Sequence, residues 1–129
     1  MEIYTSYFGN LKKIVEKGIV PVGIAVSPPK WYRGIIYKRL APHYAMLQMS
    51  REKYDIEFQK ILLFQNPREV HQDFLKFSQG KPIALLCFEF DRNDCHRLKV
   101  AEWIELKMGI KVPELVVPKA PKFTQTMLF

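Results

Sequence analysis

Cysteine is scarce in this chain of 129 residues, which contains two, Cys87 and Cys95. Two cysteines cannot form the disulfide framework that holds many small secreted domains together, so we expect reduced thiols. Long apolar runs are also missing, and no stretch approaches the length that crosses a bilayer. The first residues lack a basic region followed by an apolar stretch, so we expect no secretory signal. These absences favour a cytoplasmic protein that does not bind membranes.

Acidic residues are missing from two parts of the chain. None lies between Lys17 and Arg51, and none follows Glu114. The formal net charge is +7. This excess favours an anionic partner, either nucleic acid or a phosphate-bearing small molecule, although solvated surface lysine accounts for the composition equally well.

Repeats and low-complexity tracts are absent, and a chain of this length suits one domain with one core. Apolar patterns of strand type alternate with patterns of helix type, as in proteins built on a parallel sheet. The sequence therefore predicts an α/β fold, a single domain with a mostly parallel sheet of about four strands and helices packed on its faces. This domain covers residues 1–117, and residues 118–129 form a basic tail. The expected strands are 2–5, 19–26, 82–88 and 110–117, and the expected helices are 11–17, 51–64, 67–79 and 95–108.

The stretch from Pro82 to Arg97 carries most of the reactive side chains. Its first seven residues are apolar, as expected of a strand buried on both faces. Asp94 is a natural N-cap, and residues 95–97 then form a first helical turn, where backbone N–H groups lack partners. We expect a site here, because ligands of parallel α/β proteins bind beyond the carboxyl ends of the strands. The other expected strand ends contribute Thr5, Ser6 and Ser27.

These residues suggest three kinds of chemistry. Cys95, at a helix N-terminus beside His96 and Arg97, is a candidate nucleophile or redox thiol, although a small packed residue fits the same position. The fork of Arg97 suits a phosphate or carboxylate, so we predict that this residue binds an anion. Glu89 is either a general base or an internal ion partner of an arginine. The predicted catalytic residues are Glu89, Cys95 and His96, and the predicted anion-binding residues are Arg97, Ser6, Ser27, Lys30 and Arg33.

Metal and disulfide chemistry are not expected from this spacing. Cys87, Cys95 and His96 are soft ligands, but their spacing fits none of the usual zinc patterns. A disulfide between Cys87 and Cys95 is geometrically conceivable, yet the inferred reducing compartment does not support it. We predict no metal and no cofactor.

The loop at residues 27–34 combines cations and aromatic rings with two prolines, which exclude both a helix interior and a sheet ladder. In nucleotide and single-strand binders, aromatic faces stack on bases and cations hold phosphates. Lys30, Trp31 and Arg33 are therefore candidate contacts. The alternative is a proline-braced loop in which Trp31 covers the core.

The spacing of Cys87-x-Glu89 and Cys95-His96-Arg97 resembles the signature of the domain-of-unknown-function 488 family, in which Cys-x-Glu ends a strand and Cys-His-Arg opens a helix. Segments 3–6, 28–32, 40–42 and 100–103 are also similar to the short variant of that family. Many members end their second strand with Asp-Val-Arg, whereas residues 24–27 of this chain lack both the acid and the arginine. The resemblance implies an α/β fold and a site at the five motif residues, and it implies no established reaction.

The last five residues, Gln125 to Phe129, form the pattern Gln-x-x-Leu-Phe. This pattern resembles the short peptide by which many bacterial replication and repair proteins dock on the DNA sliding clamp, with Gln125, Leu128 and Phe129 as the contact residues. The alternative is a final strand or an apolar plug that packs on its own domain.

Together these features predict an anion site for phosphate, nucleotide or nucleic acid in the stretch from Cys87 to Arg97. They fit a DNA-processing or DNA-modification factor. Two alternatives stay open, an interaction module that docks on a sliding clamp and a thiol-redox protein that uses Cys95. The sequence does not decide whether the chain is an enzyme.

Overall fold

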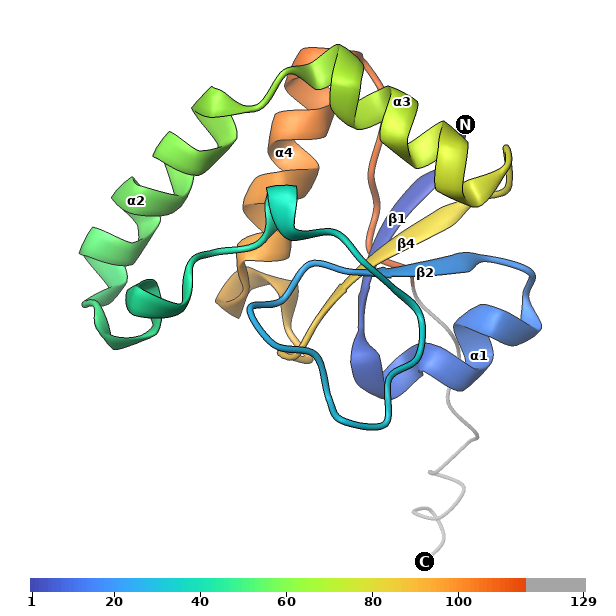
Figure 1. The fold of residues 1–129 in the computed structure, drawn as a ribbon, viewed down its shortest axis with the longest axis horizontal. Helices are drawn as coiled ribbons and strands as arrows, with labels where there is room; N and C mark the ends of the chain where they lie inside the picture. Colours follow the sequence, from blue (N-terminus) through green and yellow to red (C-terminus); the bar gives the residue numbers. More distant parts are fainter. Residues whose placement is uncertain (116–129) are drawn as a thin grey trace, which may run out of the picture.

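Strand β4 (Ile83–Cys87) lies inside a four-stranded, all-parallel sheet with the strand order β1-β4-β2-β3 (Figure 1). Its neighbours are β1 (Ile3–Tyr7) and β2 (Val20–Gly23), and β2 in turn pairs with the short strand β3 (Ile35–Ile36). The computed structural model describes residues 1–115. The predicted α/β fold with a parallel sheet is confirmed.

The central position of β4 follows from its sequence, Ile-Ala-Leu-Leu-Cys, in which every residue is buried. Successive residues face opposite sides of the sheet because the side-chain period of a strand is two. Ile83 and Leu85 join a larger core, and Ala84 and Leu86 join a smaller one. A strand with apolar side chains on both faces needs a packed layer on each side.

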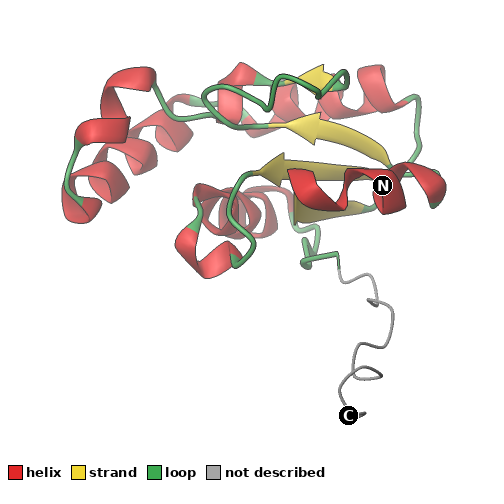
Figure 2. Ribbon diagram, turned by 90° about the horizontal axis from the view of Figure 1, so that it is seen from below, coloured by secondary structure: helices red, strands yellow, loops and turns green. Residues whose placement is uncertain are grey.

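Four α-helices in the described part of the chain supply these layers (Figure 2). Helices α2 (Arg51–Phe64), α3 (Pro67–Ser78) and α4 (His96–Met108) contribute to the larger core, and α1 (Leu11–Glu16) contributes Ile14 to the smaller one. No helix within residues 1–115 is long and apolar enough to span a membrane.

The ends of these helices follow local sequence signals. The Ser50 hydroxyl accepts a hydrogen bond from the Lys53 N–H, and the Asn66 side chain accepts from the first turn of α3, which begins with Pro67. Gly109 ends α4 with a φ of 70°, a left-handed conformation that favours glycine. The predicted helix boundaries at 51, 64, 67 and 108 are confirmed.

The last predicted strand differs from the structure. Residues 110–115 form no strand, and the β-bridge that joins this segment to the sheet is the isolated one between Glu114 and Thr5. Pro113 cannot donate to a ladder, although its carbonyl accepts from the Thr5 N–H at 3.0 Å. The segment nevertheless runs beside β1 at the edge of the sheet, and β3 supplies the fourth strand instead.

The predicted loop at residues 27–34 is confirmed, but the interpretation in which Trp31 covers the core is not. Trp31 is 56% exposed and does not cover the core, whereas Tyr32 is buried and its ring packs against Phe8. The Tyr32 hydroxyl donates to the Ile35 carbonyl at 2.6 Å, which ties the loop to β3.

Candidate active site at the end of strand β4

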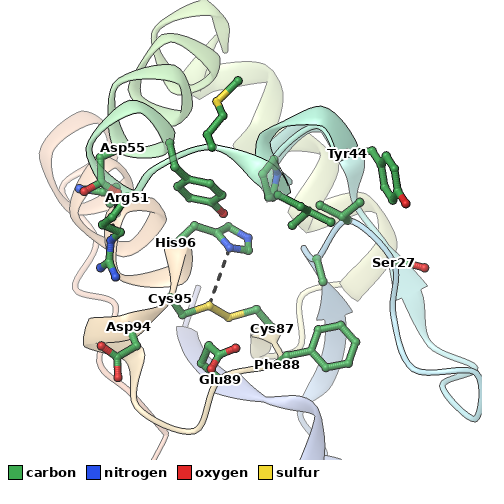
Figure 3. Close-up of a pocket in the computed structure, with 17 residues that line it drawn as sticks. Ser27, Tyr44, Arg51, Asp55, Cys87, Phe88, Glu89, Asp94, Cys95 and His96 are labelled. Carbon is green, nitrogen blue, oxygen red and sulfur yellow. Dashed lines mark hydrogen bonds and ion pairs between the residues drawn. A yellow bond between two sulfur atoms is a disulfide. The ribbon is translucent and has the colours of Figure 1, made fainter.

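A cavity of about 510 Å³ opens beyond the carboxyl ends of β2 and β4 (Figure 3). Residues 25–27 and 87–89 form the side next to the sheet, and residues 94–96 of the turn into α4 form another. The opposite wall comes from residues 42–55, which include the N-terminal turn of α2. The expected position of a site at this edge of the sheet therefore coincides with a cavity.

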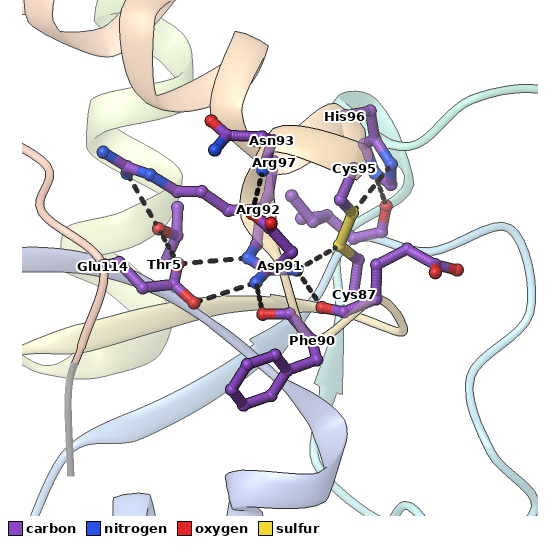
Figure 4. Close-up of a disulfide and its surroundings, with 12 residues drawn as sticks. Thr5, Cys87, Phe90, Asp91, Arg92, Asn93, Cys95, His96, Arg97 and Glu114 are labelled. Atoms are coloured by element: carbon purple, nitrogen blue, oxygen red, sulfur yellow. Dashed lines mark hydrogen bonds and ion pairs between the residues drawn. A yellow bond between two sulfur atoms is a disulfide. The ribbon is translucent and has the colours of Figure 1, made fainter.

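The two cysteines meet in this cavity. Cys87 is the last residue of β4 and is 1% exposed, whereas Cys95 is the N-cap residue of α4 and is partly exposed. Their sulfur atoms are joined in a disulfide across a Cα–Cα distance of 7.2 Å (Figure 4). This bond corrects the expectation of two free thiols, which rested on the inferred compartment and not on the path of the chain between the two residues.

The start of α4 also corrects the predicted cap. Asp94 lies in a 3₁₀ helix, Arg92–Asp94, and Cys95 takes the N-cap position without a side-chain hydrogen bond. Asp91 caps the 3₁₀ helix by accepting from the Asn93 N–H at 2.9 Å. The extra turn places Cys95 opposite the end of β4.

His96 is buried behind the disulfide with both ring nitrogens engaged. Its Nε2 atom lies 2.6 Å from the Ile24 carbonyl oxygen and its Nδ1 atom lies 3.8 Å from Cys95 Sγ. Burial and, to a lesser degree, the charge of Arg97 lower the pKa of His96 to about 4 against the opposing effect of the Ile24 carbonyl, so the ring is neutral near pH 7. A carbonyl can only accept, so Nε2 carries the proton and donates it, and Nδ1 presents its lone pair to the sulfur.

Arg97 is completely buried and its guanidinium is fully used inside the protein. Nε and Nη2 donate to the two carboxylate oxygens of Glu114 at 3.1 and 2.8 Å. Nη1 donates to the Glu89 carbonyl at 2.5 Å and to Cys87 Sγ at 3.1 Å, and Nη2 donates to the Phe90 carbonyl at 2.8 Å. These five hydrogen bonds match the five N–H groups of a guanidinium. That Arg97 binds an anion stays a prediction, and the geometry favours a positioning role.

Glu114 is the partner of Arg97 that sequence reasoning missed. It also accepts from the Thr5 hydroxyl at 2.7 Å, and Arg92 donates to that hydroxyl at 3.1 Å and to the Val112 carbonyl at 3.0 Å. The turn after β4 is thus held against β1 and against residues 112–114 (Figure 4). No sequence signal pairs Glu114 with Arg97, because their contact depends on the path of the chain beyond α4.

The other predicted site residues divide into two groups. Glu89 and Ser27 line the cavity together with Cys95 and His96, and within residues 1–115 the Glu89 carboxylate has no ion partner. Ser6 is buried elsewhere and accepts from the Asn10 side chain at 3.2 Å. Lys30 and Arg33 lie in an exposed loop outside the cavity lining, and Arg33 donates to the Lys30 carbonyl at 2.6 Å.

The opposite wall of the cavity contains residues that the sequence did not assign to a site. Tyr54 lies there beside Arg51, and Arg51 pairs with Asp55 at 3.5 Å. Lys99 also lines the cavity. The sequence could have indicated this position, because residues four apart lie on one face of a helix and Lys99 follows Cys95 by four residues.

The predicted clamp-docking residues Gln125, Leu128 and Phe129 lie outside the described residues, as do residues 116 and 117 of the expected last strand.

Comparisons with known proteins give one match. A family model described as DUF488-N3a, the active DUF488-N3 subclade, matches residues 9–108, a range that includes β2, β4, α4 and all five motif residues. Neither the curated proteins nor the solved structures contain a match to this chain. The matched range covers most of the chain, and the protein therefore belongs to the DUF488-N3a family, whose function is unknown, as the resemblance of its Cys-x-Glu and Cys-His-Arg motifs predicted.

Proposed function

We propose that this protein is a thiol-dependent oxidoreductase in which Cys95 and Cys87 alternate between a dithiol and a disulfide. The observation that carries the proposal is the pair of joined sulfur atoms at the floor of the cavity, with His96 Nδ1 3.8 Å from Cys95 Sγ. A cysteine pair that opens onto a cavity is accessible to a second thiol or disulfide, whereas a structural disulfide in a core is not.

The exposure of the two cysteines supports different roles for them. Cys95 is partly exposed and Cys87 is 1% exposed, so an external disulfide reaches Cys95 first. The Cys95 thiolate attacks one sulfur of an organic disulfide, which forms a mixed disulfide and releases one thiolate. The Cys87 thiolate then attacks Cys95 Sγ, which releases the second thiolate and forms the Cys87–Cys95 disulfide. Two electrons pass from the cysteines to the substrate, and the two cysteine protons end on the two released thiols.

Two neighbouring side chains support this assignment. Arg97 Nη1 donates to Cys87 Sγ at 3.1 Å, and a positive charge against a sulfur favours its thiolate as attacking and leaving group. His96 places a lone pair beside Cys95 Sγ and is held in that orientation by the Ile24 carbonyl. Arg97 and His96 therefore each contact a sulfur atom that takes part in the proposed exchange.

The cavity suits a small organic disulfide better than a strongly anionic ligand. Its wall includes the apolar and aromatic side chains of Leu47, Met49, Tyr54 and Phe88. Its charged lining residues are the cations Arg51 and Lys99 and the acids Asp55, Glu89 and Asp94. Two cations against three carboxylates leave no excess of positive charge at the site.

A disulfide-exchange assay with the full chain tests the proposal. The reduced protein, with a chelator present, is mixed with hydroxyethyl disulfide, and release of the small thiol is followed. We expect release above the background of free thiols, loss of release in Cys95→Ser, and a trapped one-to-one mixed disulfide on Cys95 in Cys87→Ser, seen by mass spectrometry. Release from Cys95→Ser at the wild-type rate, or none above background from the wild type, would contradict the proposal.

The anion site and the DNA-processing role predicted from the sequence remain a second hypothesis, supported by the net charge of +7 and by Arg51 and Lys99 at the cavity. A bound ligand raises the melting temperature of the folded state. If inorganic phosphate, nucleotides and single-stranded oligonucleotides all leave the melting temperature unchanged, this hypothesis fails, whereas the thiol proposal is unaffected.

A further inference from the structure

Three soft donor atoms converge at the floor of the cavity. Cys87 Sγ, Cys95 Sγ and His96 Nδ1 all lie within 4.8 Å of one another. They come from the end of β4 and from the first residues of α4, two elements that the Arg97 hydrogen bonds fix relative to each other. The spacing of these residues in the sequence matches no common zinc motif, so their convergence is a result of the fold.

The distance between Cys95 Sγ and His96 Nδ1 suits a metal ion with tetrahedral coordination, and the two sulfurs, which are joined here, must separate to bind one. Zinc binds thiolate sulfur at about 2.3 Å and imidazole nitrogen at about 2.0–2.1 Å, which places two such donors about 3.6 Å apart at a tetrahedral angle. Cys95 Sγ and His96 Nδ1 are 3.8 Å apart. The donor set of two sulfurs and one imidazole excludes hard cations such as Mg²⁺ and Ca²⁺, which prefer oxygen ligands.

The surroundings of the donors are also those of a metal site. A ligating histidine usually donates its other ring N–H to a carbonyl or carboxylate, which fixes the ring orientation, and His96 Nε2 lies 2.6 Å from the Ile24 carbonyl. Cys87 Sγ accepts a hydrogen bond from Arg97. Two thiolates and a neutral imidazole around a divalent ion give a complex with no net charge, which limits the cost of placing it in a half-buried site.

We propose that the reduced protein binds one soft divalent metal ion of the zinc class through Cys87, Cys95 and His96, and that oxidation to the disulfide releases it. Joined sulfurs cannot serve as two thiolate ligands, so the metal and the disulfide exclude each other. Three protein ligands leave a fourth position, which faces the cavity and takes water or a small ligand. This site requires reduced cysteines but not the exchange reaction.

Cobalt(II) is a suitable probe, because its spectrum reports tetrahedral sulfur coordination. The full chain is reduced with a phosphine, titrated with Co²⁺ under inert gas and then with Zn²⁺. We expect one Co²⁺ per chain with a sulfur-to-cobalt charge-transfer band, complete displacement by Zn²⁺, and loss of the band when the same sample is oxidised to the disulfide. This comparison of reduced and oxidised wild type does not depend on whether any variant folds.

Substitutions then test the ligands. Cys95→Ser and His96→Ala should each weaken Co²⁺ binding by more than about tenfold. Loss of an outer-shell partner alone weakens metal binding by at least about that factor, and these substitutions remove a ligand itself. His71→Gln on α3 is the matched control and should bind as the wild type does, with circular dichroism to check folding. A reduced wild type without the charge-transfer band, or equal binding before and after oxidation, would overturn the proposal. Its failure is separable from that of the exchange reaction, which is measured with a chelator present.

Discussion

At the scale of single residues, Arg97 has a role that its sequence context does not reveal. The motif places it at a helix N-terminus, where an anion-binding role is the natural interpretation. The structure instead gives every N–H of its guanidinium a partner within the protein, including both oxygens of Glu114. A local pattern identified the important arginine, but its partner lies 17 residues away along a path that no local pattern predicts.

We expect removal of Arg97 to reduce the stability of the folded protein more than it reduces the binding of a ligand. Breaking a buried ion pair by deleting one partner costs about 3–5 kcal/mol. Arg97→Ala should therefore lower the free energy of unfolding by about this amount, measured by urea denaturation under oxidising conditions. Arg33→Ala, in the exposed loop, is the control and should change it by less than about 0.5 kcal/mol. An unchanged urea midpoint for Arg97→Ala would refute the positioning role.

Tyr32 should titrate abnormally. Burial raises its pKa to about 12, well above the usual value of 10 for tyrosine. Its neutral form is favoured in the folded state, so the stability it contributes is complete below pH 10 and is lost as the pH rises toward 12. An absorbance titration of phenolate should show that Tyr32→Phe lacks one late-titrating group. The alternative result, loss of a group that titrates near pH 10, would show that Tyr32 is solvated.

At the scale of elements, the parts that local sequence determines were predicted well. The ranges expected for β4, α2, α3 and α4 have the correct element types and nearly correct ends. The two-residue strand β3 is too short to leave a pattern, and its pairing with β2 depends on a loop that folds back. The cavity wall from residues 42–55 was missed for the same reason, since it reaches the site through tertiary packing alone.

The cap at Ser50 matters because α2 begins there and carries Arg51 and Tyr54 at the cavity. Replacing a serine N-cap by alanine costs about 1 kcal/mol. Ser50→Ala should therefore lower the free energy of unfolding by about 1 kcal/mol in urea denaturation. Ser50→Asp keeps an acceptor at the cap and should stay close to the wild type. Equal losses in both variants would mean that the hydroxyl does not act as a cap.

At the scale of the whole molecule, the disulfide closes a short loop between the end of β4 and the start of α4, with a sequence separation of 8. In the chain-entropy model, closing a loop of this length stabilises a protein by roughly 2–3 kcal/mol. A phosphine reductant should therefore lower the free energy of unfolding of the metal-free protein by about that amount. The Cys87→Ser and Cys95→Ser double variant should show no response to the reductant. A wild type that is equally stable in both states would contradict the prediction.

The tail makes a separate prediction for the whole chain. If residues 125–129 dock on a DNA sliding clamp, their deletion should abolish pull-down by a clamp, and the triple alanine variant of Gln125, Leu128 and Phe129 should do the same. The control is Thr126→Ala, which leaves the pattern intact. Clamp binding that survives the deletion would reject the prediction.

The place of β4 between β1 and β2 has a consequence for synthesis on the ribosome. Its two neighbours are both made earlier, yet neither pairs with the other, since each forms its ladder with β4. A nascent chain that ends before Ile83 therefore has no strand to bridge them, and the backbone edges of β1 and β2 that pair with β4 have no ladder partner until the last third of the chain emerges. The sheet then closes in one late step, which also brings Cys87 to the site where Cys95 will follow.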